Sequence, residues 1–409
     1  MTFPEGGLQA WLTVAGASMV LFCTFGMVQS FGVFQDYYTR VSLTDRTTSE
    51  ISWIGSVQVF LLFGVALPVG KLYDEGYFHH LMAFGSLLYL FSIFMLSLCK
   101  PHHYYQNFLS QGVGMGLAMA ILFLPAVSIV SHYFQRRRAA SMGVVFAGSS
   151  LGGVIWPIML NRLFNNSAGF AWGVRTAGFI ALVLLLIANL IMRTRLPSAK
   201  QRPPMEKPRM ATILSDRAYW VTITGGLFIF WGLFFPFFYL QLFAVLHGVD
   251  RNIALYSIPL LNAGSVFGRT IPNYLADKWG KFNVILPCTT ISAALVFALF
   301  GATNTGGMVV FALLYGFFSG VFISLVSPLL AGFSMSVQEV GLRIGVGMTW
   351  ASVALLVGNP ISGALLAQPR FLWYRPIIFN AVMIFAGCAL QFTGRQMLRR
   401  KRRMTSQIL

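Results

Sequence analysis

Twelve apolar stretches, each long enough to cross a lipid bilayer, follow one another through this 409-residue chain. A helix that crosses the hydrocarbon core needs roughly 20 predominantly apolar residues. The chain is therefore predicted to be an all-α membrane protein. The predicted spans cover residues 11–34, 51–70, 78–98, 104–131, 139–161, 170–192, 218–244, 252–274, 282–302, 306–332, 340–367 and 373–394.

The placement of positive charge predicts the orientation of these spans. The net charge is +18, and 20 of the 29 Lys and Arg residues lie in the segments on one side of the spans. Eight lie on the other side, and Arg269 lies within a span. Cytoplasmic segments are enriched in Lys and Arg, so both termini are predicted to be cytoplasmic. The basic residues are expected to contact anionic lipids at that face of the bilayer, not nucleic acid.

A basic segment with four prolines divides the spans into six and six. Residues 193–216 have no apolar face to bury and are predicted to form a cytoplasmic linker. The linker separates an amino-terminal bundle, residues 1–192, from a carboxy-terminal bundle, residues 217–396, and a basic tail follows at 397–409. Two repeated bundles with a substrate site between them at mid-membrane are the organisation of many transporters.

Similar short motifs follow the second and the eighth spans, about half the chain apart. The first contains Gly70, Asp74 and Gly76, and the second contains Asp277 and Gly280. A carboxylate at a helix junction can accept hydrogen bonds from free backbone N–H groups and pair with a nearby Arg or Lys. The motifs are predicted either to latch the cytoplasmic ends of the bundles or simply to cap helices.

Two further segments carry a family resemblance. Residues 4–11 read Pro-Glu-Gly-Gly-Leu-Gln-Ala-Trp, and residues 133–150 join the fourth and fifth spans through Arg136, Arg137 and Arg138. They are similar to the entry motif and the signature of the monocarboxylate porter family, especially its fungal members, within the major facilitator superfamily. The resemblance implies two six-helix bundles that alternate in access. The three arginines are expected to anchor the cytoplasmic face and to belong to the moving surfaces.

Arg269 is the one basic residue predicted to lie well inside a span. A buried guanidinium can bind both oxygens of a carboxylate, and the resemblance implies a substrate-linked Arg at this motif. The alternative is that Arg269 snorkels to the headgroups or pairs with another helix. On the same resemblance, Gln29, Asn262, Ser265 and Tyr239 are candidates to line the substrate site.

The resemblance also implies a coupling mechanism that this chain does not repeat. The family's animal carboxylate carriers have an Asp one turn before the Arg and a Lys in the first span, where this chain has Ser265 and Gln29. All eleven Asp and Glu residues fall in predicted loops or span ends, so no carboxylate is predicted at mid-membrane to relay protons. Proton-coupled symport of lactate or pyruvate is disfavoured, and proton coupling is left open.

Three functions are compatible with the sequence. The first is transport of a small organic solute, monocarboxylate-like or vitamin-like, across the plasma membrane or else a vacuolar or other internal membrane. The second is export of a secondary metabolite, and the third is nutrient sensing without transport. No nucleophile–base pair, metal-ligand cluster or phosphate loop occurs, so neither an enzyme nor a cofactor or metal site is expected.

Overall fold

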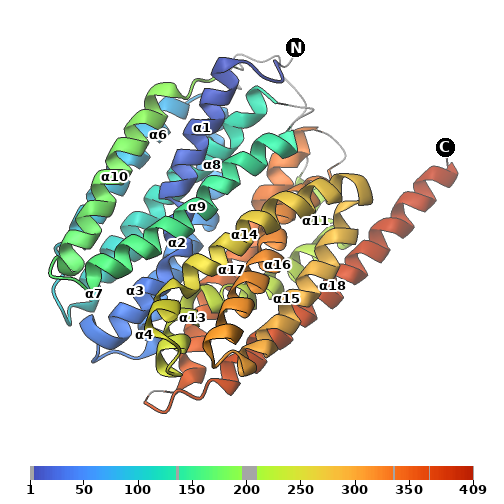
Figure 1. The fold of residues 1–409 in the computed structure, drawn as a ribbon. Coiled ribbons are helices and arrows are strands. Elements are labelled where there is room, and N and C mark those ends of the chain that lie inside the picture. The colour runs from blue at the N-terminus through green and yellow to red at the C-terminus, as the bar shows by residue number, and fades with distance from the viewer. Residues whose placement is uncertain (1–3, 135–137, 196–209, 335–336, 368, 409) are drawn as a thin grey trace.

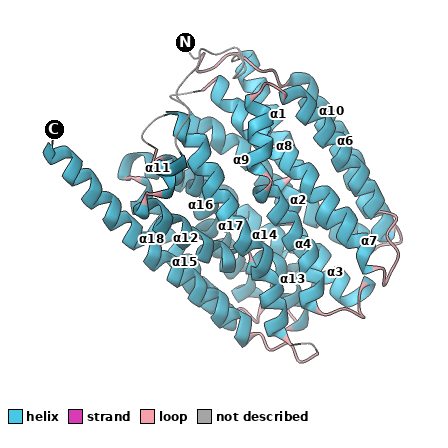
Figure 2. Ribbon diagram, turned by 180° about the vertical axis from the view of Figure 1, so that it is seen from behind, coloured by secondary structure: helices cyan, strands magenta, loops and turns pink. Residues whose placement is uncertain are grey.

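The computed structural model describes residues 4–134, 138–195, 210–334, 337–367 and 369–408. Within these ranges the chain consists of helices and short loops, without a strand. Figure 1 shows the two halves of the chain side by side, the first in blue to green and the second in yellow to red. Figure 2 shows the same arrangement from behind. The predicted all-α fold with two six-helix bundles is confirmed.

Several of the spans in the first half are built from more than one helical element. Their elements are, in order, α1 (Leu8–Cys23), α2 (Phe25–Gln29), α3 (Phe31–Tyr37) and η1 (Tyr38–Ser42); α4 (Thr48–Gly64) and α5 (Ala66–Asp74); α6 (Phe78–Leu96); α7 (Tyr104–Asn107), η2 (Phe108–Met115), α8 (Gly116–Ile129) and η3 (Val130–His132); α9 (Arg138–Phe164); and α10 (Gly169–Ile191).

The second half is more regular, and a short helix precedes it. Its elements are, in order, α11 (Met210–Leu214); α12 (Arg217–Leu233) and α13 (Phe235–Leu246); α14 (Arg251–Trp279); α15 (Lys281–Ala298) and η5 (Leu299–Gly301); α16 (Thr305–Ala331); α17 (Val337–Leu366); and α18 (Tyr374–Ile408). The predicted tail after residue 396 is not a separate segment, because α18 continues through it and projects from the bundle (Figures 1 and 2).

The first span is interrupted by hydroxyl side chains that bond to its own backbone. The Thr24 hydroxyl donates to the carbonyl of Val20 at 2.8 Å, and the Ser30 hydroxyl donates to the carbonyl of Gly26 at 2.8 Å. Such bonds compete with the helical ladder and bend it. The bends separate α1, α2 and α3.

The span that differs from the others is α14. Eleven helical stretches among the described residues are long and apolar enough to cross a membrane, and α14, although 29 residues long, is not among them. Its polar side chains Asn262, Ser265 and Arg269 are buried, whereas Phe267 and Ile271 are exposed. Because α14 packs between α9 and α16, its polar face meets protein and its apolar face is left for lipid.

Close backbone contacts hold α14 against α16. A Cβ atom on Gly264 would clash with the carbonyl of Leu313, and one on Gly316 would clash with the carbonyl of Leu261. Lipid tails are as apolar as the helix surface, so the hydrophobic effect does not drive helices together within the membrane. They associate instead through close packing at small residues. The two helices therefore approach too closely for any side chain larger than hydrogen at these positions.

We expect Gly316→Ala to lower the free energy of unfolding by about 1–3 kcal/mol, since a backbone carbonyl cannot move aside as a side chain does. Gly143→Ala is the matched control, because Gly143 also lies in a helix and has open space at its Cβ position. Thermal unfolding of the purified protein in detergent measures both. An unchanged unfolding temperature in Gly316→Ala would contradict this packing.

Candidate functional site

The hydrogen bonds that join the two halves are concentrated at one end of the bundle. We call the end where both termini lie the terminal end, and the end formed by α3, the start of α4 and the end of α17 the opposite end (Figure 1). Among described partners, cross-half hydrogen bonds at the opposite end are Thr48 to Gly363, Ser49 to Pro360, Asn161 to Gln241 and Leu255, Arg162 to Tyr256, Gln241 to Asp36, and Tyr239 to Thr48. The protein is thus closed at the opposite end.

One cross-half contact lies deeper in the bundle, at Arg269. Its guanidinium donates to Gln29 Oε1 and to Ser149 Oγ, each at 2.7 Å. Gln29 in turn donates to the carbonyl of Ser149 at 3.1 Å. The Arg269 side chain is fully buried, and its carbon Cζ lies 5.7 Å from the centre of the Phe25 ring. Arg269 neither snorkels nor faces lipid; it bridges from α14 to α2 and α9.

The charge of Arg269 has no carboxylate partner among the described side chains. Its Nε atom also has no hydrogen-bond partner there. A buried cation without a counter-ion is costly, and an anion that reaches it recovers part of that cost. The chemistry of this guanidinium therefore suits a carboxylate or another acidic oxygen.

The other predicted site residues are buried, but they do not form one cluster with Arg269. The Asn262 side chain fills the space beside Gly153 of α9, and its Oδ1 has no partner among the described residues. Ser265 lies against Gly320 of α16, inside the second half. Tyr239 donates to the carbonyl of Asn359 at 3.0 Å, at the opposite end. Only Gln29 contacts the guanidinium directly.

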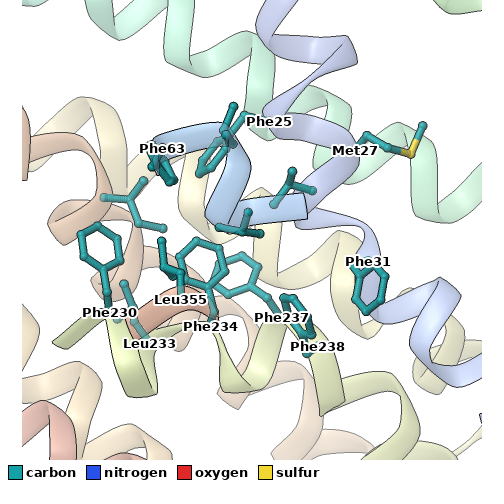
Figure 3. Close-up of a cluster of buried hydrophobic side chains, with 14 of the residues drawn as sticks. Phe25, Met27, Phe31, Phe63, Phe230, Leu233, Phe234, Phe237, Phe238 and Leu355 are labelled. Carbon is teal, nitrogen blue, oxygen red and sulfur yellow. The ribbon is translucent and has the colours of Figure 1, made fainter. Parts of the chain in front are cut away.

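Phenylalanine side chains surround the region between the halves (Figure 3). Phe25 and Phe63 come from the first half, and Phe230, Phe234 and Phe237 come from the second. The Phe25 and Phe63 ring centres are 6.1 Å apart, and those of Phe234 and Phe237 are 5.4 Å apart. These buried rings form an apolar layer between the halves, and the Phe25 ring lies beside the cation of Arg269.

The loop motifs after the second and eighth spans have the turn geometry expected of their glycines. Gly76 has a φ of 100° and Gly280 a φ of 87°, in the region that glycine adopts without strain. Gly70 lies within α5 against Leu124. Asp74 and Asp277 lie in helices, but their side chains, with that of Arg138, are outside the described residues, as are Arg136 and Arg137. Whether these residues latch or cap stays a prediction.

Two buried charge clusters were missed by the sequence analysis. At the opposite end, Asp36 is paired with Arg40 at 2.5 Å. At the terminal end, the guanidinium of Arg343 lies 3.2 Å from Asp216 and 3.3 Å from Glu339. The signal available in the sequence was the spacing of four residues between Asp36 and Arg40 and between Glu339 and Arg343, which brings opposite charges together on a helix.

These features define a polytopic helical transporter whose two halves close around a buried cation. The sequence pattern of the Major Facilitator Superfamily matches residues 10–306. The chain belongs to this superfamily and is a transmembrane transporter of a small organic solute.

Fungal proteins are similar over most of the chain. The aspyridones efflux protein of Emericella nidulans is 43% identical over 385 residues, covering 94% of this chain and 77% of that protein. The agnestins efflux protein of Paecilomyces divaricatus is 40% identical over 380 residues, covering 93% and 86%. Among solved structures, the nucleoside transporter NupG, in a mutant form, superposes with a TM-score of 0.69 at 14% identity, covering 95% of this chain and 99% of that one. NupG shares the fold.

We expect Gln29→Leu to lower the free energy of unfolding by about 1–3 kcal/mol, because it takes an acceptor away from the buried guanidinium of Arg269. Arg269→Gln also removes the cost of burying an unpaired charge, so it is compared with Gln29→Leu through the double variant. Since both changes remove one shared hydrogen bond, the double variant should lose clearly less than the sum. Thermal unfolding in detergent compares the native protein, the two single variants and the double variant, with the exposed neighbour Thr270→Val as control. Additive losses would show that the two side chains do not interact.

Proposed function

We propose that this protein exports an aromatic secondary metabolite that carries an acidic group. The observation that carries the proposal is the position of Arg269, which is buried between the halves and lacks a carboxylate partner among the described side chains. An acidic oxygen of the solute would replace Gln29 or Ser149 as the acceptor of the guanidinium. Binding would then act on both halves at once, because those two residues belong to the first half and Arg269 to the second.

The aromatic lining supports a flat solute larger than lactate. Phe25, Phe63 and Phe230 are buried and come from three different spans. Ring stacking against such side chains contributes beyond the area they bury. A three-carbon acid offers no surface for this contact, whereas an aromatic metabolite does. The relatives named for aspyridones and agnestins efflux support the same direction of transport.

Membrane orientation is part of the proposal. The excess of Lys and Arg in one set of connecting segments supports cytoplasmic termini, with anionic lipid at that face. On this orientation the opposite end faces the outside, and a solute enters from the cytoplasm while that end is closed. We assign the protein to the plasma membrane, since export from the cell requires it.

Membership of the monocarboxylate porter family is also proposed, on the segments 4–11 and 133–150. The coupling in this protein would differ from proton symport of small acids, because Gln29 and Ser265 stand where the animal carriers have Lys and Asp. A neutral amide cannot exchange a proton with a carboxylate at physiological pH. Export driven by the solute's own gradient agrees with these residues.

The test compares aspyridone with lactate as probes in yeast cells that express the chain. We expect the native chain to speed the efflux of preloaded aspyridone and to leave lactate unaffected. Arg269→Gln should slow the initial efflux rate by about tenfold or more, the loss expected for one charge-assisted hydrogen bond. Arg217→Gln, which removes an exposed positive charge at the start of α12, is the matched control and should behave like the native chain.

Two results would contradict the proposal. Accumulation of the aromatic probe inside the cells would reverse the direction of transport. Equal efflux by Arg269→Gln and by the native chain, at equal amounts in the membrane, would show that the guanidinium does not bind the solute.

A further inference from the structure

We propose that Asp36 is a positioning residue of the exit gate: through Gln241 it holds the opposite end of the two halves together, and this hydrogen bond breaks before the solute leaves. The inference rests on the proposed orientation, in which the opposite end faces the outside. It assigns a transport step to a carboxylate that takes no part in the candidate solute site.

The contacts of Asp36 divide into one that stays and one that must break. Arg40, one turn later on the same helical stretch, donates to the carboxylate from Nε and from an Nη atom, each at 2.5 Å. Gln241 Nε2, from α13 of the other half, donates to Oδ2 at 3.0 Å. Arg40 moves with Asp36, so their ion pair persists when the halves separate. The bond to Gln241 cannot.

Gln241 is itself held in place by a pair of hydrogen bonds from the first half. It donates to Asn161 Oδ1 at 2.9 Å and accepts from Asn161 Nδ2 at 3.1 Å. Asn161 also donates to the carbonyl of Leu255 at 2.9 Å. The Asp36 side chain is 3% exposed within this network. A charge-assisted hydrogen bond is stronger in such a poorly solvated setting than at the surface.

An aromatic layer lies next to this polar layer, on the side of the candidate site. The rings of Phe31 and Phe238, from opposite halves, have centres 4.7 Å apart. A Cβ atom on Gly55 would come within 2.6 Å of the Phe31 ring and 2.7 Å of the Phe238 ring. The two rings therefore pack directly against Gly55, with no room for a side chain at that position. The aromatic layer blocks the solute, and the polar layer keeps the blocking side chains together.

The other carboxylates near this end, and two further groups, have partners of their own. Glu50 accepts hydrogen bonds from Thr47 at the start of α4, and Asp250 caps the start of α14. Arg162 donates to the hydroxyl of Tyr256, and His247 bonds to the carbonyl of Phe243. Asp45 lies in the loop before α4 and pairs with Arg46 and His102. Asp36 is thus the carboxylate that the described contacts place between the halves at this end.

The test measures the separation of the halves in purified protein, without solute. Spin labels at the exposed positions Asn166 and Asn252 report the distance across the opposite end in lipid nanodiscs, with the four free cysteines replaced by alanine. Gln241→Glu places a second carboxylate beside Asp36. At pH 8 repulsion should raise the ratio of the long-distance to the short-distance population by about tenfold, and at pH 5 the pair should share a proton and close again.

Further variants distinguish a gate held by the Asp36–Gln241 hydrogen bond from a merely structural role of these residues. Asp36→Asn combined with Gln241→Glu restores a donor and a charged acceptor with their roles exchanged, so closure should return at pH 8 and the pH dependence should disappear. Asp45→Asn removes an exposed carboxylate at the same end and should leave the distances unchanged. Reclosure of Gln241→Glu at pH 5 also demonstrates that this variant is folded.

The proposal is overturned if Gln241→Glu keeps the native distances at pH 8, or if the double variant remains open. It is independent of solute export in this assay. If the distances respond as expected but aspyridone is not exported by the native chain, the proposed function fails and the gate assignment stands.

Discussion

The hydrogen bonds of Arg269 are the interaction on which the arrangement of the two halves depends. A guanidinium in the middle of a membrane protein is retained only if protein groups replace the water it has lost. Here the replacements, Gln29 and Ser149, lie on the other half of the molecule. The solvation of one side chain therefore requires the two bundles to be in contact. Any solute that solvates the guanidinium instead changes the stability of that contact.

The overall fold could be predicted from the sequence because it follows from span length and charge placement. Eleven spans stand out by hydropathy, and α14 was also identified, although its polar residues make it the least apparent. The division of the first span at Thr24 and Ser30 was not predicted, because back-bonding by a hydroxyl depends on its rotamer. The helical continuation of α18 beyond residue 396 was not predicted, since residues 397–409 were interpreted as a separate basic tail.

The site was predicted less completely than the fold. Arg269 and Gln29 were placed in one site by family resemblance, and their side chains do meet. Ser265, one turn from Arg269, faces α16 instead, because α14 has two buried sides and the sequence does not say which neighbour each side contacts. Asp36 was predicted to follow the first span, placed at residues 11–34, but the helix includes Asp36 and continues to Ser42. Its burial depends on Gln241, and a contact between residues 205 positions apart leaves no periodic signal in the sequence.

The close glycine contacts between α14 and α16 have a mechanical consequence. With the carbonyls of Leu261 and Leu313 seated directly against glycines of the facing helix, neither helix can slide or roll on the other without collision. The two helices therefore move as a single rigid unit, and Arg269 belongs to it. When the second half tilts, the guanidinium moves with it as part of one rigid unit. The distance between Arg269 and Gln29 then changes in step with the tilt of the whole half.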